Sequence, residues 1–353
     1  MRKGFIATSE YGTLPALACG METTYFPEHV TACAEHPLRN GARALLHILR
    51  QARQKQVIML SSSTLVECLA IARMGTWSRE QQPVVILFGD MFGGKSRLKQ
   101  VAMRLLIKAM DRAIDGYIVQ STDDQRTFPH TWKVNPDKVH VALLGYTFHD
   151  NKIRDADIRT GDYIFAGGNS QRDYDTLVEV ARQMPEQRFI FATWKLAGRR
   201  DIPANVIAES VSQERFQHLM GQSRLVVTSI RRGLLRAVGQ QTYLNAMRLG
   251  KLSIVNERDV LGLQDYIVHG QTGLLVDGSP ESYVAAIRWA LDPQHTEQVQ
   301  RICIEAQRVV QADFSYAHFL QRLSAAANTI ILSSSKPVLH QNSAPQIHLA
   351  TPD

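Results

Sequence analysis

The sequence predicts an α/β protein with two Rossmann-like, doubly wound domains that face each other across a cleft. From residue 56 onward, short apolar runs rich in β-branched residues alternate with longer stretches of helical periodicity. Such alternation is typical of parallel strands joined by right-handed helical crossovers. The alternation stops over a polar stretch at 148–162 and then starts again. Because parallel sheets bind ligands at the carboxyl ends of their strands, two such sheets favour a ligand with two parts, one held by each domain.

The polar stretch sets the predicted domain boundary. A chain of 353 residues is long enough for two domains that each bury a core. We expect an N-terminal domain at 1–150 and a C-terminal domain at 151–332. Residues 333–353 are polar and contain proline, which predicts a disordered tail.

In the first domain, the apolar runs predict strands and the stretches between them predict helices. The segment 38–54 is expected to be helical, whereas the strand signal before it is weak. The apolar runs predict strands at 56–60, 83–88, 116–121 and 138–145, and helices at 63–74 and 95–114.

The second domain repeats this pattern more clearly. Its apolar runs predict strands at 163–168, 188–193, 205–210, 224–229, 251–255 and 272–277. Helical periodicity predicts helices at 173–184, 212–221, 239–249 and 280–291.

The composition excludes several classes of protein. With 44% hydrophobic and 21% charged residues, the chain has the balance of a soluble globular protein. No apolar run approaches the roughly 20 residues of a membrane span, and the N-terminus lacks the continuous apolar core of a signal peptide. The four cysteines have no paired spacing, which predicts neither a disulfide framework nor a metal site. We therefore expect a cytoplasmic protein.

The charge is concentrated in one helical segment. The net charge of +7 is compatible with nucleic acid, anionic lipid or phosphorylated ligands. Residues 95–112 contain six basic residues and one acidic residue, with apolar residues at helical intervals. This segment is interpreted either as a helix that lies on an anionic membrane surface or as a core helix with a solvated basic face. Nucleic acid is not expected as a partner, because the basic cluster is poor in aromatic residues.

The segment "YIFAGGNSQRDYDTL" is the first candidate site. A strand ends at Gly167 and Gly168, where the absence of side chains permits close approach of the backbone. Asn169 or Ser170 is expected to cap the helix that follows, whose first turn then presents N–H groups. Arg172 adds a forked cation suited to phosphate oxygens. These features predict an anion site for a diphosphate, and a tight turn with an exposed arginine is the alternative.

The segment 227–278 is a second candidate site with the same features. A strand ends at Ser229, and a loop with Arg231, Arg232 and Arg236 leads to Gly239. The next residues open a helix whose first turn is polar, with Gln240, Gln241 and Thr242. Two basic, glycine-containing loops before helices in one domain strengthen the prediction of a diphosphate site.

These segments, in this order, resemble the nucleotide-sugar-binding domain of GT-B glycosyltransferases of family 4. The resemblance covers residues 160–295 well and is carried by "YIFAGGNSQRDYDTL", "NVIAESVSQERFQHLMGQSRLVVTS", "VGQQTYLNAMRLGKLSIV" and "DYIVHGQTGLLVDGSPESYVAAI". More weakly, "QPVVILFGDMFGG" is similar to the family's strand that faces the donor. The resemblance extends over most of residues 83–295.

The resemblance implies a retaining transfer of a sugar from a nucleotide-sugar to a hydroxyl acceptor, in cell-surface polysaccharide or glycolipid synthesis. It implies that no metal or other cofactor is needed, because cations and helix dipoles stabilise the leaving diphosphate. The implied donor-binding residues are Gly167, Gly168, Asn169, Arg172, Arg231, Gly239, Gln240, Gln241, Thr242 and Asn245. Three residues are assigned to catalysis. Arg172 is expected to bind the diphosphate and Asn245 the ribose. Asp90, which lies outside the donor-binding set, is expected to orient the donor or the acceptor.

The chain also departs from the family pattern. The two glutamates of the family's E-x7-E pair fall at Ala237 and Asn245, and the position of a common histidine is Gly89, followed by Asp90. The family's Gly-Arg pair at the opening strand is Gly167-Gly168. These departures support an alternative, a GT-B protein that binds a nucleotide-sugar or a partner enzyme with little transfer activity. The sequence does not determine the sugar, the base or the acceptor.

Overall fold

The computed structural model describes residues 5–7, 23–25, 37–60, 65–89, 97–148 and 161–336. The chain divides into two compact units. The first comprises Met1–Leu143 together with Phe319–Asp353, and the second comprises Leu144–His318. The boundary between the units lies at 143/144, where the sequence predicted 150/151, and the described residues 319–336 belong to the first unit.

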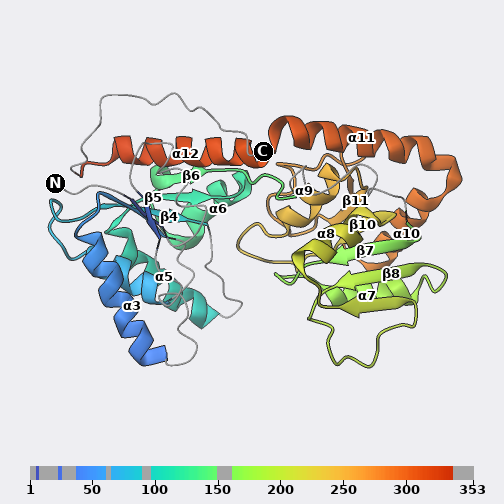
Figure 1. Ribbon diagram of the computed structural model, residues 1–353, viewed down its shortest axis with the longest axis horizontal. Helices are drawn as coiled ribbons and strands as arrows, with labels where there is room; N and C mark the ends of the chain where they lie inside the picture. Colours follow the sequence, from blue (N-terminus) through green and yellow to red (C-terminus); the bar gives the residue numbers. More distant parts are fainter. Residues whose placement is uncertain are drawn as a thin grey trace. The chain divides into compact units, whose positions relative to one another are not determined.

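The first unit is built on a parallel sheet of six strands in the order β2-β1-β3-β4-β5-β6. The strands are β1 Phe5–Ala7, β2 Thr23–Tyr25, β3 Val57–Leu60, β4 Val84–Phe88, β5 Ile114–Val119 and β6 Val139–Val141. The helices between them are α3 Pro37–Ala52, α4 Leu65–Met74, α5 Arg97–Asp111 and α6 Thr122–Trp132. Neighbouring helices in the run α3, α4, α5 pack side by side (Figure 1).

The last helix, α12 Tyr316–Ser333, completes the first unit. Its Ile330 occupies the space above Gly116 of β5, where a Cβ atom would collide with the isoleucine. After the helix, the Lys336 ammonium bonds to Asp115 at 2.6 Å and to two backbone carbonyls. The predicted disordered tail from 333 was therefore wrong for residues 334–336, because this ion pair fixes them. Residues 337–353 lie outside the described part of the chain.

The second unit has a second parallel sheet, in the order β12-β11-β10-β7-β8-β9. The strands are β7 Tyr163–Gly167, β8 Arg188–Ala192, β9 Val206–Glu209, β10 Leu225–Thr228, β11 Ser253–Asn256 and β12 Leu274–Val276. The helices are α7 Tyr174–Arg182, α8 Gln213–Gly221, α9 Gln240–Arg248, α10 Pro280–Leu291 and α11 Thr296–Asp313. The strand order reverses between β7 and β10, which makes their carboxyl ends the switch point of the sheet.

Each face of this second sheet has its own core. Every second residue along each strand, such as Ile164 of β7 and Phe189 of β8, packs with α7, α10 and α11 on one face. Their neighbours Phe165 and Ile190 pack with α8 and α9 on the other face. The alternation follows from the period of two in a strand, and it shows that both faces are covered. Polar groups are therefore left to the strand ends, where the predicted site residues lie.

Candidate anion site at the switch point

Two loops of the second unit meet at the carboxyl ends of β7 and β10. Arg172 and Ile230 form an isolated antiparallel bridge between the loops. The Arg231 N–H donates to the Gln171 carbonyl at 2.9 Å. Asn256, at the end of β11, uses its side-chain amide to bond both the N–H and the carbonyl of Ile230. The two segments that the sequence marked separately are thus joined into one site.

Arg172 lies at the centre of this site and is only 5% exposed. Its guanidinium donates to the carbonyls of Gly167 and Ser170 at 3.2 and 2.9 Å, and to Thr242 Oγ1 at 2.7 Å. A guanidinium has five N–H donors, so these three bonds leave one hydrogen on each terminal nitrogen. Burial lowers the pKa of Arg172 from its ordinary value.

The Arg172 cation has no acidic partner within the described part of the chain. Among the described residues, no ion pair joins it to a carboxylate, and its hydrogen-bond acceptors are two backbone carbonyls and one hydroxyl. A buried charge is costly unless an opposite charge compensates it. The site is therefore electrostatically incomplete without an anion.

The N-terminus of α9 adds to the positive potential. Gly239 is the N-cap residue, with φ of 91° and no side-chain cap. A Cβ atom at Gly239 would lie 3.2 Å from Nη1 of Arg172 and 2.8 Å from Cδ1 of Ile230. The guanidinium therefore lies beside the positive end of the helix dipole, and both favour a bound anion. The predicted convergence of Arg172 and Gly239 on one site is what the structure shows.

The glycine turn has the conformation that its sequence predicts. Gly168 has φ of 104°, and a Cβ atom there would lie 3.1 Å from Nη2 of Arg172. The Gly168 carbonyl accepts a bond from the Tyr174 hydroxyl at 2.8 Å. At Gly167, a side chain would collide with the ring of Phe216. Both glycines are thus needed to bring the backbone of the turn around the arginine.

Asn169 has a different role from the predicted helix cap. Its Oδ1 accepts bonds from Thr193 Oγ1 at 2.6 Å and from the Trp194 N–H at 3.3 Å, which ties the turn after β7 to the turn after β8. The cap of α7 is Asp173, whose carboxylate accepts from the Thr176 N–H. The expectation that Asn169 or Ser170 caps this helix was wrong, because the antiparallel bridge at Arg172 delays the start of the helix.

The four site residues predicted on α9 have different surroundings. Thr242 accepts from Arg172, and Gln240 is buried. The Gln241 amide donates to the Gly145 carbonyl at 3.1 Å, while its Oε1 is buried and unbonded among the described residues. Asn245 is 3% exposed, and its Oδ1 accepts from the backbone N–H groups of Thr147 and Phe148 at 2.8 and 3.1 Å. This amide holds the segment that enters the second unit, which differs from the predicted contact with a ribose.

Two further cations lie on the turns that meet at this sheet edge. Arg231 is exposed on the loop that bridges to Gln171. The pKa of Lys195 is lowered, first by burial and then by the charges of Arg231 and Arg172. Sequence reasoning missed Lys195, Tyr174 and Asn256. For Asn256 a signal was present, since it is a polar residue at the end of an apolar run.

The remaining predictions lie elsewhere or cannot be placed. Asp90 lies outside the described residues; the adjacent Gly89 follows β4 with φ of 77°. The acidic pair Asp123 and Asp124 lies in the first turn of α6, whose N-cap is Ser121. Within the described ranges, no three or more His, Cys, Asp or Glu residues cluster in a way that would hold a metal ion.

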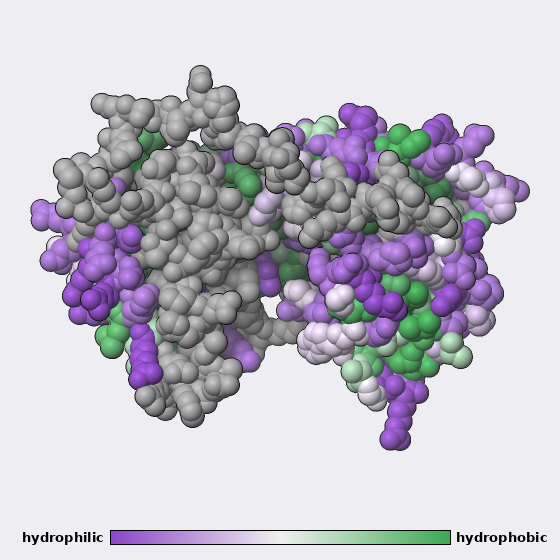
Figure 2. Space-filling model, viewed as in Figure 1, coloured by the Kyte–Doolittle hydropathy of each residue, from purple (hydrophilic) through white to green (hydrophobic). Residues whose placement is uncertain are grey.

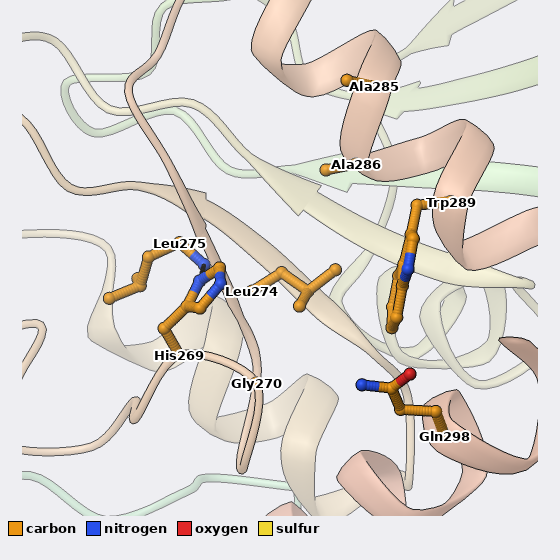
Figure 3. Close-up of a pocket in the computed structure, with 8 residues that line it drawn as sticks. All are labelled: His269, Gly270, Leu274, Leu275, Ala285, Ala286, Trp289 and Gln298. Carbon is orange, nitrogen blue, oxygen red and sulfur yellow. Dashed lines mark hydrogen bonds between the residues drawn. The ribbon is translucent and has the colours of Figure 1, made fainter.

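A separate cavity lies at β12 and contains none of the predicted site residues. Figure 3 shows Leu274 between His269 and Trp289, with Gln298 of α11 beside the indole. Its volume is about 500 Å³. The lining residues are His269, Gly270, Leu274, Leu275, Ala285, Ala286, Trp289 and Gln298. Most of these side chains are apolar, which distinguishes the cavity from the charged site at the switch point.

Comparison with known proteins shows the fold. No model of a known family matches the chain, and no curated protein matches it by sequence. Among solved structures, Anabaena HepE in complex with UDP-glucose matches with a TM-score of 0.70 at 15% identity, covering 93% of this chain and all of HepE. Sucrose-phosphate synthase from Thermosynechococcus elongatus matches with a TM-score of 0.70 at 14% identity, covering 94% of this chain and all of the synthase. A glycosyltransferase from Rickettsia africae matches with a TM-score of 0.62 at 13% identity, covering 95% of this chain and all of that chain.

The fold is therefore that of the GT-B glycosyltransferases, as the sequence predicts. At these identities the likeness establishes the arrangement of strands and helices, and the chemistry has to be argued from the site itself.

Proposed function

We propose that the chain is a glycosyltransferase that binds a nucleotide-sugar donor with its diphosphate at Arg172. The observation that carries the proposal is a buried guanidinium at the N-terminus of α9 with no acidic partner in the described part of the chain. A diphosphate supplies a negative charge, and its oxygens can accept hydrogen bonds from the two remaining N–H groups of Arg172. HepE, a structural neighbour, has been solved in complex with UDP and with UDP-glucose, and this supports the same class of ligand here.

The proposed reaction is a retaining transfer to a hydroxyl acceptor without a metal. As the bond to the sugar breaks, negative charge grows on the leaving diphosphate. Arg172, Arg231 and the start of α9 are the groups placed to stabilise it. These fixed charges take the place of a divalent cation, so we propose that neither metal nor cofactor is required. The mechanism is proposed from the resemblance to family 4, and the acceptor is proposed to be a saccharide or a lipid-linked saccharide of the cell surface.

Binding of the donor is the first test. In a thermal-shift screen of UDP-, GDP- and ADP-sugars, we expect one class to raise the melting temperature in proportion to the logarithm of its concentration above Kd. Replacing Arg172 by methionine should lower the affinity for that donor by about 10- to 150-fold, as measured by calorimetry. This corresponds to about 1.5–3 kcal/mol, the value of a charge-assisted contact.

The control is Arg308→Gln, which removes an exposed arginine that pairs with Glu305 on α11. This variant should bind the donor as the wild type does, and chelation of divalent metals should change neither binding nor transfer. Equal affinity of the Arg172 and Arg308 variants would remove Arg172 from the site, and failure of all three donor classes to bind would remove the proposed function.

A second function is favoured by one position. Ala237, where the resemblance places the first acid of the family pair, is a buried alanine in the loop before α9. An alanine offers no polar group to the sugar, so we keep as the alternative a protein that binds the nucleotide-sugar with little transfer. Assays of transfer and donor hydrolysis separate the two: binding at micromolar donor without turnover over many acceptors supports the alternative.

We also propose that the protein acts at the cytoplasmic face of a membrane, on its anionic surface. Along α5, Leu98, Val101 and Leu105 are 80%, 51% and 65% exposed, and their spacing places them on one face. We name these three residues the α5 apolar stripe. Basic residues of the same helix flank it, which is the pattern of helices that lie in a membrane interface. No helix in the described part of the chain is long and apolar enough to span a bilayer.

A further inference from the structure

The turn after β8 places an exposed aromatic ring beside the anion site. Gly167 of β7 pairs with Ala192 of β8, so the two strands end at the same edge of the sheet. Two residues after β8, the Trp194 side chain is 58% exposed. A large exposed indole is unusual on a protein surface and is a common platform for flat ligands.

Hydrogen bonds fix this turn to the loop that carries Arg172. Asn169 accepts from both Thr193 and Trp194, and the Lys195 N–H in turn donates to Thr193 Oγ1 at 3.1 Å. The buried Leu196 anchors the turn from below. The backbone under the indole is therefore tied to the glycine turn that leads to Arg172.

Lys195 adds a cation next to the ring. Its ammonium is 5.9 Å from the centroid of the Trp194 ring, near the outer limit of a cation–π contact. Burial, and after it the charges of Arg231 and Arg172, lower the pKa of the Lys195 ammonium. The turn after β8 thus brings an aromatic face and an ammonium to the sheet edge that also carries the turn of Arg172. An aromatic face next to cations suits a nucleotide, which has an aromatic base at one end and phosphates at the other.

We propose that Trp194 is the stacking platform for the nucleobase and that Lys195 binds a phosphate of the same nucleotide. When the phosphates occupy the site, the Lys195 ammonium moves from the indole toward them, and the ring face becomes available to the base. This inference rests on the proposed function, because it assigns two residues to the donor site that function requires. It gives the base a contact that depends on its aromatic face and is tolerant of its identity.

Calorimetry with two probes tests the assignment. The first probe is inorganic pyrophosphate, and the second is whichever of UDP, GDP and ADP the wild type binds most tightly. Trp194→Ala should weaken the nucleotide by 5- to 150-fold, the range for loss of one base–aromatic stack, and leave pyrophosphate affinity unchanged. Lys195→Gln should weaken both probes by a similar factor.

The matched control is Trp77→Ala, which removes a tryptophan of the first unit that also lies under a cation, with Arg53 at 5.2 Å from its ring. It should bind both probes as the wild type does. Unchanged pyrophosphate affinity in the Trp194 variant shows that the site is folded. If the variant also binds the nucleotide normally, the inference is overturned while the proposed function stands; if the wild type binds neither probe, both fall.

Discussion

Arg172 and Lys251 are two cations that the second unit removes from water, and they differ in what surrounds them. Arg172 keeps two unused N–H groups beside a helix N-terminus, where an anion can reach them. Lys251 lies in the turn between α9 and β11, where burial lowers its pKa to about 8 and the nearby Cys303 thiol opposes the shift. We propose a bound anion as the reason for the first arrangement. The second is a matter of stability.

The free energy of unfolding should depend on Lys251 in mildly alkaline solution. Between pH 8 and 9 the unfolded chain keeps the proton on Lys251 while the folded chain releases it. Unfolding then takes up protons, so the free energy of unfolding rises with pH. The rise is about 1 kcal/mol between pH 8 and pH 9. Urea unfolding at the two pH values should show this rise in the wild type and a smaller rise in Lys251→Met.

Lys108→Met, a change at an exposed lysine of α5, is the control and should keep the rise of the wild type. Because Cys303 and Lys251 act on each other's pKa, all three proteins are compared in a Cys303→Ala background, where this thiol does not titrate. Identical pH dependence of the two variants would show that Lys251 keeps its proton in the folded state.

At the scale of elements, the site depends on how turns join strands to helices. The antiparallel bridge at Arg172 and Ile230 joins two turns that lie 58 residues apart in the sequence. The Asn256 side chain bonds the backbone of Ile230 in the second turn. The Asn245 side chain bonds the backbone of residues 147 and 148. Side-chain amides suit this task because each offers both a donor and an acceptor.

Two glycine substitutions should have opposite effects on stability, because the space around the glycines differs. At Gly145 a Cβ atom would collide with the backbone of Ser315, which cannot rotate away; Gly145→Ala should cost about 1–3 kcal/mol. At Gly41, inside α3, a Cβ atom would lie 3.6 Å from Cγ2 of Val66, an ordinary contact. Gly41→Ala should therefore stabilise by about 0.5–1 kcal/mol.

Chemical unfolding followed by circular dichroism measures both changes. The two variants serve as controls for each other, since each adds one methyl group. A Gly145 variant as stable as the wild type would show that the segment 144–148 is not held against Ser315.

At the scale of the whole molecule, the described surface combines charge with exposed apolar groups. On the face shown in Figure 2, hydrophilic residues cover most of α3, with a hydrophobic group among them. Leu46 of α3 and Leu69 of α4 are exposed in the same layer of helices as the α5 apolar stripe. An anionic bilayer is a surface that would bury such leucines and attract the basic residues around them.

Binding to vesicles tests this surface. The protein should sediment with vesicles that contain phosphatidylglycerol and should release as salt screens the attraction. Changing Leu98, Val101 and Leu105 together to serine should weaken this binding at least tenfold, because the apolar contribution of the stripe is lost. Leu332→Ser, at an exposed leucine of α12, is the control and should bind normally. Equal binding of the two variants would contradict a role for the stripe.

Local pattern was enough to predict most of the elements. The runs around 163–168 and 224–229 are too apolar and too β-branched for anything but buried strands, and the structure has β7 and β10 there. Gly168 and Gly239 both adopt positive φ, as glycines at strand and helix ends are expected to. These features depend on neighbours within a few residues, which the sequence displays directly.

The sequence alone therefore determined the α/β class, the two parallel sheets and the convergence of Arg172 with Gly239. Only the tertiary structure decided that Arg172 is buried without an acid, that Asn245 bonds backbone groups of Thr147 and Phe148, and that Trp194 and Lys195 lie beside the site. The reason is physical: burial and hydrogen-bond partners depend on residues brought together from distant segments, and no local pattern of polarity records which segment will arrive.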